Sequence, residues 1–126
     1  MARLRPPAPF LRCLFLVVQV VSVAKQKSKG VVMADAGFKA SFKGMPLCVS
    51  HPRVVVRRVN AEHAYLDVSN HDERFALGDT LLLQPFYSDA TTCLHRRVHG
   101  YARGAAPGAW VAGDVFDLED SLGMLA

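Results

Sequence analysis

The sequence predicts an all-β fold, an antiparallel β-barrel or sandwich of about seven to eight short strands. Two observations predict it. Runs rich in valine and leucine recur along the 126 residues, and Gly, Pro, Asn and Asp interrupt them at short intervals. We find no repeat and no convincing helical pattern between the runs, whereas parallel strands need long, usually helical connections. The length fits one domain with one core and is too short for a (β/α)₈ barrel of roughly 250 residues.

The first expected strand covers about residues 13–24, within the segment FLRCLFLVVQVVSVA. Its valines are branched at Cβ and therefore favour a strand. The apolar run is too short for a bilayer-spanning helix of about 20 residues, so we expect a buried strand and no membrane contact. Arg3 and Arg5 precede the run, and Ser22-Val23-Ala24 is similar to a signal-peptidase site. A signal peptide at 1–24 therefore stays open as an alternative.

Five further strands follow from local patterns. Pro52 suits the first position of a strand, apolar residues alternate from Ala64 to Val68, and a Gly-Asp turn precedes a leucine run that Pro85 ends. The expected strands are 53–59, 64–68, the leucine run before Pro85, the segment CLHRRVHGYARG, and WVAGDVFDL.

The CLHRRVHGYARG segment, read as a strand, places polar side chains on one face because side chains alternate along a strand. That face would carry His95, Arg97, His99, Tyr101 and Arg103. The row either lines an interface or is the solvated face of an edge strand.

Composition and charge limit the function classes. Half of the residues are apolar, which is typical of a globular protein and not of a disordered one. The net charge of +4 is uneven, since residues 1–58 carry eleven basic and one acidic residue, and 59–126 carry four basic and ten acidic. Such asymmetry is found in nucleic-acid-binding proteins, and equally where two halves of one fold attract each other. No basic stretch alternates with aromatic residues, so we expect no nucleic-acid binding.

The cysteine content indicates a reducing compartment. Cys13, Cys48 and Cys93 are odd in number and widely spaced, which is unlike a disulfide framework or a zinc knuckle. We therefore expect a cytoplasmic protein. If residues 1–24 were a signal peptide, a small secreted β-protein would result instead.

The order of several motifs is similar to that of a known enzyme family. DAGFKA at 35–40 comes first, then Glu62-His63 before a strand, then LGDTLLLQPFYSDATTCLH at 77–95. From about Phe10 to Val115 the chain resembles the C-terminal β-domain of the D-serine dehydratase and D-threonine aldolase family, which are pyridoxal-phosphate enzymes of the alanine-racemase fold type. In that family a catalytic (β/α)₈ barrel precedes the β-domain and carries the cofactor on a lysine.

The resemblance implies a domain organisation and a function. Residues 1–9 would be a flexible N-terminus, 10–117 a D-serine dehydratase-like β-domain and 118–126 an acidic tail. The complete enzyme would act on a D-amino acid by β-elimination or retro-aldol cleavage. This chain lacks the barrel, so we expect no catalytic residue, no bound pyridoxal phosphate and no activity by the chain alone. Its partner would be a barrel domain or a second copy, and a non-catalytic interaction or dimerisation module is the alternative.

The resemblance also places a divalent metal site here. The family's HxC or HxD ligand pair falls on Tyr87 and Asp89, so the aspartate matches while a tyrosine replaces the histidine. Tyrosine ionises near pH 10 and is a poor substitute for imidazole, and catalytic zinc takes three protein ligands. We therefore expect a degenerate site that binds Zn²⁺ or Mn²⁺ weakly or not at all. Asp89 with Cys93 or His95 could form a makeshift site, and a polar turn stabilised by Asp89, Thr91 and Thr92 is the structural alternative.

The remaining candidates have plainer interpretations. Lys39 is expected to be a surface or structural lysine, and Asp35 to order its loop by accepting backbone hydrogen bonds, with a contact to the barrel as the alternative. Glu62 and His63 are expected to be structural, and Cys93 a buried or half-buried thiol without a base beside it. His95 and His99 are candidates for an interface with the missing barrel.

Overall fold

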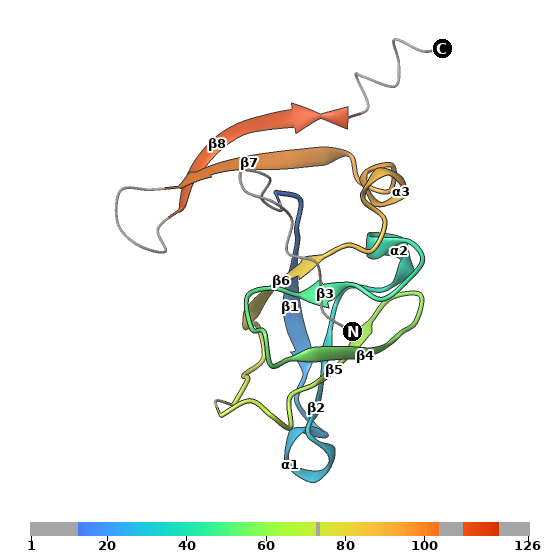
Figure 1. Ribbon diagram of the computed structural model, residues 1–126, viewed down its shortest axis with the longest axis vertical. Helices are drawn as coiled ribbons and strands as arrows, with labels where there is room; N and C mark the ends of the chain where they lie inside the picture. The colour runs from blue at the N-terminus through green and yellow to red at the C-terminus, as the bar shows by residue number, and fades with distance from the viewer. Residues whose placement is uncertain (1–12, 73, 104–109, 119–126) are drawn as a thin grey trace, which may run out of the picture.

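The computed structural model describes residues 13–72, 74–103 and 110–118 of the chain (Figure 1). Within these residues the strands are β1 (Leu16–Ser22), β2 (Val31–Ala34), β3 (Leu47–Cys48), β4 (Val55–Val59), β5 (Ala64–Asp67), β6 (Thr80–Gln84), β7 (Arg97–Arg103) and β8 (Trp110–Asp117). The helices are α1 (Gln26–Lys29), α2 (Phe38–Ser41) and α3 (Ser88–Thr92). None of the described helices is long and apolar enough to cross a membrane.

Six strands form one sheet in the order β3-β6-β1-β2-β5-β4, and every neighbouring pair is antiparallel. The two ends of this order, β3 and β4, also contact each other, so the sheet curves into a nearly closed barrel. The predicted fold class is therefore confirmed. Closure leaves little unpaired edge on this sheet.

The valine-rich segment forms a central strand of the barrel, as the sequence predicts. β1 pairs with β6 on one side and with β2 on the other, through Leu16 opposite Leu83 and Val20 opposite Ala34. Val18 and Val20 are buried, whereas Val17 is exposed, because side chains alternate between the two faces of a strand. Cleavage after Ala24 would remove this strand from between its two partners.

The core fills the barrel interior with side chains from all six strands of the barrel. Leu66, Leu81 and Leu83 are completely buried, and truncating such a leucine to alanine typically costs about 2–5 kcal/mol. Two polar residues, Ser41 and Thr91, are also buried among the described residues. Both belong to the region where α2 and α3 meet.

The structure corrects several expectations about local structure. Three one-turn helices occupy segments for which the sequence predicts no helix, since one turn is too short to show a period of 3.6 residues. β4 begins at Val55 rather than at 53, because the Val54 N–H bonds to the His51 carbonyl in a turn. The predictions for residues 1–9 and for 119–126 of the acidic tail lie outside the described residues.

β7 and β8 form a separate two-stranded hairpin that stands at one end of the barrel, with β8 on the far side (Figure 1). β7 begins at Arg97, so the prediction that His95 shares a strand face with Arg97 is wrong. The register also shifts between His99 and Tyr101, which breaks the alternation predicted along this strand.

The hairpin carries two apolar cross-strand pairs, Val98 with Phe116 and Ala102 with Val111, on either side of the register shift. Phe116 and Val111 each leave 57% of their surface exposed. A two-stranded hairpin without a packed face is marginally stable in water. The hairpin is therefore stabilised mainly by the hydrogen bonds between β7 and β8.

Candidate functional site

Helix α2 begins at the DAGFKA motif, where the chain approaches the loop before β5 very closely. A Cβ atom on Gly37 would lie 2.3 Å from the Ala61 carbonyl oxygen, so the close approach requires glycine. The N–H groups of Phe38 and Lys39 donate to the carbonyls of Asn60 and Ala61 at 2.8 and 3.1 Å. These bonds satisfy two of the N–H groups that a helix start leaves free.

Helix α3 is the SDATT segment, for which the sequence predicts a polar turn or a degenerate metal site. The hydroxyls of Thr91 and Thr92 lie 2.7 and 2.8 Å from the carbonyls four residues earlier, those of Tyr87 and Ser88. The two threonines therefore do stabilise the segment, as expected for the structural alternative, although within a helical turn. Asp89 is exposed in the first turn, and the Ser88 hydroxyl lies 3.4 Å from its carboxylate.

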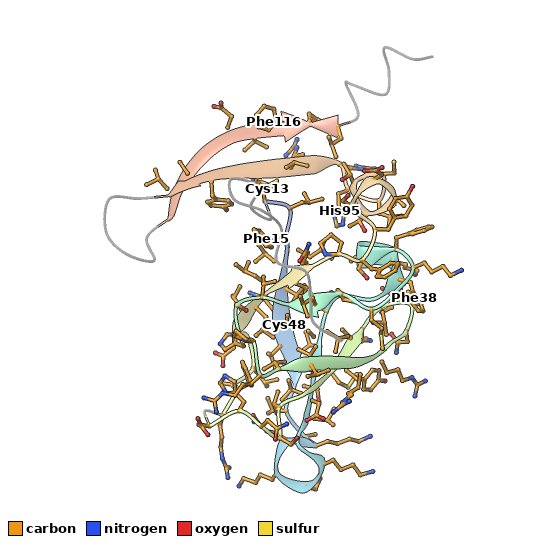
Figure 2. The ribbon with its side chains drawn as sticks, in the orientation of Figure 1. Cys13, Phe15, Phe38, Cys48, His95 and Phe116 are labelled. Carbon is orange, nitrogen blue, oxygen red and sulfur yellow. The ribbon has the colours of Figure 1, made fainter. Side chains whose placement is uncertain are left out.

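Two long-range hydrogen bonds hold α3 against α2. The buried Thr91 hydroxyl lies 2.9 Å from the Ser41 carbonyl. The His95 Nε2 lies 2.7 Å from the Ala40 carbonyl, and Figure 2 shows His95 next to α3, close to α2. Since a carbonyl only accepts, Nε2 carries the proton and is engaged by the backbone. His95 thus connects two helices and does not belong to the hairpin.

The two positions that the resemblance assigns to metal ligands have different surroundings. The Tyr87 ring packs edge-on against the Phe42 ring with centroids 6.1 Å apart. Within residues 13–72, 74–103 and 110–118, no three His, Cys, Asp or Glu side chains are grouped to hold a metal ion. The family's metal therefore does not fit this donor set, since His95 Nε2 is also engaged. Weak or absent metal binding stays a prediction.

The remaining candidates near α2 take structural positions. Lys39 is largely exposed and forms an ion pair with Glu62, which is consistent with a surface lysine. The Asp35 carboxylate accepts the Gln19 N–H at 2.8 Å, which is consistent with the expected backbone hydrogen bonding. The His63 N–H donates to the Asn60 side-chain oxygen at 2.6 Å. None of these contacts assigns a chemical step to the residues.

The structure places Cys93 and His99 differently from what the sequence predicts. Cys93 is exposed, so its expected burial is wrong. The cause is that Cys93 follows the last turn of α3 at the surface instead of lying in a strand. His99 is exposed on β7, opposite Val115, and therefore belongs to the hairpin and not to the α2–α3 region.

Among the described residues, a clear shift in pKa occurs elsewhere, at Asp67 on β5. The hydroxyl and the N–H of Ser69 donate to Asp67 at 2.5 and 3.0 Å, and the Arg57 Nε donates at 3.0 Å. The Ser69 hydroxyl, then its N–H, and then Arg57 stabilise the charged carboxylate and lower the pKa of Asp67 from 3.8 to about 2. This cluster stabilises the turn after β5 and is not near α2 or α3 in sequence.

Sequence reasoning missed two groupings of side chains. The rings of His51, His71 and Phe75 lie with centroids 5.0–5.2 Å apart, beside a shallow depression of about 350 Å³. Phe42 and Tyr87 belong to a second group of aromatic residues around α2 and α3. Neither grouping has a signal in spacing, because its members come from segments at least 20 residues apart.

Comparisons with known proteins agree with this architecture. Residues 13–101 match the sequence profile of a family described as a putative serine dehydratase domain. The fold is similar to the crystal structure of D-threonine aldolase from Filomicrobium marinum, with a TM-score of 0.71 and 26% sequence identity over 89% of this chain. The chain spans 29% of that protein. No curated protein sequence matches the chain.

Two further structures share the fold at lower identity. D-threo-3-hydroxyaspartate dehydratase from Delftia sp. HT23 has a TM-score of 0.57 and 20% identity, covering 78% of this chain and 30% of that one. An alanine racemase-like protein from Idiomarina loihiensis has a TM-score of 0.57 and 19% identity, covering 68% of this chain and 27% of that one. In each comparison the matched region is less than a third of the larger protein.

Proposed function

The chain belongs to the putative serine dehydratase domain family, and we propose that it is the C-terminal β-domain of a lyase that acts on D-amino acids. One observation carries the proposal: a family match over residues 13–101 coincides with a fold that corresponds to 29% of a D-threonine aldolase. The complete enzyme would catalyse β-elimination or retro-aldol cleavage of a D-amino acid. The catalytic barrel would come from another segment or another chain.

The lysines of this chain support a separate source for the cofactor site. Pyridoxal phosphate is held by a lysine amine that burial or neighbouring cations activate. All five lysines of the sequence are exposed, and Lys39, the one in the DAGFKA motif, is paired with Glu62. The residues of this chain therefore do not fit the cofactor, and we assign the Schiff-base lysine to the barrel. The chain alone would be inactive.

We propose bounds of 10–117 for the β-domain, between an N-terminal segment of nine residues and an acidic tail at 118–126. β1 and β8, the first and last strands described, both lie within these bounds. We also propose a cytoplasmic location, which the three free cysteines support. Asp35, His95 and His99 would then contact or support the barrel, and Tyr87 with Asp89 would be the remnant of a metal site.

A domain exchange tests the proposal. Residues 10–117 replace the matched part of the Filomicrobium marinum D-threonine aldolase, and cofactor absorbance and cleavage of D-threonine are measured. We expect the chimera to bind pyridoxal phosphate and cleave D-threonine at a reduced rate, while residues 1–126 alone and the aldolase without its β-domain do neither. Turnover by 1–126 alone, abolished in Lys39→Ala, would show that the chemistry is in this chain. A truncated aldolase as active as the chimera would remove any role for the domain.

A further inference from the structure

We propose that His51 and His71 together bind a divalent transition-metal ion of the kind that prefers imidazole ligands, with Zn²⁺ as the representative ion. Both side chains are half-buried and line a shallow depression of about 350 Å³, so an ion can reach them from solvent. Among the described residues no three His, Cys, Asp or Glu side chains are grouped, so the proposed site has two protein ligands and is completed by water. The inference goes beyond the catalytic function proposed above and does not depend on it.

The separation of the two imidazole rings suits a shared ion. Their centroids lie 5.2 Å apart, and their planes are inclined by 57°. A zinc–nitrogen bond of about 2.0–2.1 Å places the ion roughly 3.2 Å from the centroid of a ligating ring, so two rings on a tetrahedral ion have centroids roughly 5 Å apart. Rotation of a ring about χ2 hardly displaces its centroid, because the rotation axis passes close to it. The backbone of both residues therefore already gives the spacing that two imidazole ligands require.

One ring nitrogen of His51 faces a hydroxyl that the backbone holds in place. The Ser50 Oγ lies 2.9 Å from the His51 Nδ1 and accepts the Leu82 N–H at 2.9 Å. A hydroxyl oxygen has two acceptor lone pairs, so Ser50 can also accept the proton of Nδ1, which places the lone pair for a metal on Nε2. A histidine that binds a metal commonly donates its other ring N–H in this way, and the bond fixes its tautomer and orientation.

The two histidines are positioned before an ion binds. Both rings pack on the buried ring of Phe75, with centroids 5.2 Å from His51 and 5.0 Å from His71. Phe75 is itself fixed by the side-chain amide of Gln26, which donates to the Phe75 carbonyl at 2.9 Å and accepts the Phe75 N–H at 2.8 Å. A site with only two protein ligands depends on such positioning, because each side chain that must be ordered on binding costs entropy.

The charges around the depression favour a cation over an anion. Arg53 also lines the depression, and its Nη1 lies 2.9 Å from the Asp72 carboxylate, so the two formal charges cancel. A divalent ion therefore meets no net positive charge from this pair. A phosphate group would instead have to compete with Asp72 for the Arg53 guanidinium.

A bound ion would connect two loops of the barrel. His51 lies in the connection from β3 to β4, and His71 lies in the connection from β5 to β6, on the same side of the barrel (Figure 1). An ion that binds the folded chain in preference to the unfolded chain stabilises the fold. Zn²⁺ should therefore raise the temperature of unfolding as well as bind.

Calorimetric titration of residues 1–126, prepared without a histidine tag, with Zn²⁺ tests the proposal. We expect one ion per chain and a dissociation constant at least about tenfold higher in His51→Gln and in His71→Gln, because one imidazole alone cannot chelate the ion. Circular dichroism checks that both variants are folded. His99→Gln removes an exposed imidazole from the hairpin and is the matched control, which should bind Zn²⁺ as the wild type does. Mg²⁺ should not bind, because it prefers oxygen ligands.

Thermal unfolding gives a second readout, since Zn²⁺ should raise the midpoint of the wild type and of His99→Gln but not of the His51 and His71 variants. Neither heat nor a shift of the midpoint at about 1 mM Zn²⁺ would overturn the proposal, as would undiminished binding in either of those two variants. Binding that is lost in Asp89→Ala would place the ion beside α3 instead. Binding of inorganic phosphate without binding of Zn²⁺ would show that the depression is an anion site.

Discussion

Replacing Thr91 by valine should destabilise the fold through one buried hydroxyl. Thr91 is 2% exposed, and its Oγ1 lies 2.9 Å from the Ser41 carbonyl and 2.7 Å from the Tyr87 carbonyl. Valine keeps the shape and the branched Cβ but removes the donor. The loss includes a net hydrogen bond of about 1 kcal/mol and the cost of leaving a buried carbonyl without its partner, about 1–3 kcal/mol. We therefore expect Thr91→Val to lower the free energy of unfolding by about 2 kcal/mol.

Thr92 provides the matched control in the next residue. Its hydroxyl lies 2.8 Å from the Ser88 carbonyl, but this bond is exposed to water, so Thr92→Val should cost at most about 0.5 kcal/mol. Urea unfolding measures both variants, and thermal unfolding should show Thr91→Val melting roughly 8–16 °C below the wild type. Equal stability of the two variants would refute the reasoning that the buried Thr91 hydroxyl, which lies between the Tyr87 and Ser41 carbonyls, stabilises the region where α2 and α3 meet.

Three other predictions concern metal binding, acid stability and local dynamics. Tyr87→His should strengthen Zn²⁺ or Mn²⁺ binding about tenfold, or about 1.4 kcal/mol, by calorimetry; tight binding by the wild type that is lost in Asp89→Ala would contradict this. The folded-state pKa of Asp67 is lowered from 3.8 to about 2, so its contribution is complete above about pH 4 and is lost as the pH falls toward 2. Asp67→Asn should remove this contribution to the loss of stability in acid. If the free energy of unfolding depended on pH in the variant as it does in the wild type, the hydrogen bonds from Ser69 and Arg57 to Asp67 would not stabilise the fold. Amides of β7 and β8 should exchange with deuterium faster than those of β1; equal protection would mean that the hairpin is packed.

The barrel could be predicted from local patterns where those patterns are strong. The valines of β1 and the leucines of β6 indicate buried strands regardless of what they pair with. β3 was missed because it has two residues and exists through its pairing with β6, more than 30 residues away. Strand pairing of such a short segment has no signal of its own in the sequence.

The candidate site was harder to predict than the fold. Alternation of polar residues placed His95 in a strand, but a hydrogen bond to the Ala40 carbonyl, 55 residues earlier, keeps it beside α3. The resemblance pointed to Tyr87 and Asp89, which lie together in one short segment. It gave no sign that Tyr87 would pack on Phe42, because that contact depends on the strained end of α2. Long-range contacts, not local propensity, determine this site.

The location of the cofactor lysine tests the account most directly. Protein recovered from its native source with an antibody against residues 1–126 is reduced with borohydride, which fixes pyridoxal phosphate to its lysine, and is mapped by mass spectrometry. The account predicts a pyridoxyl-lysine peptide from outside residues 1–126, in the same polypeptide or in a co-purifying barrel chain. A pyridoxyl group on Lys39 or another lysine of this chain, or none on any recovered protein, would contradict it.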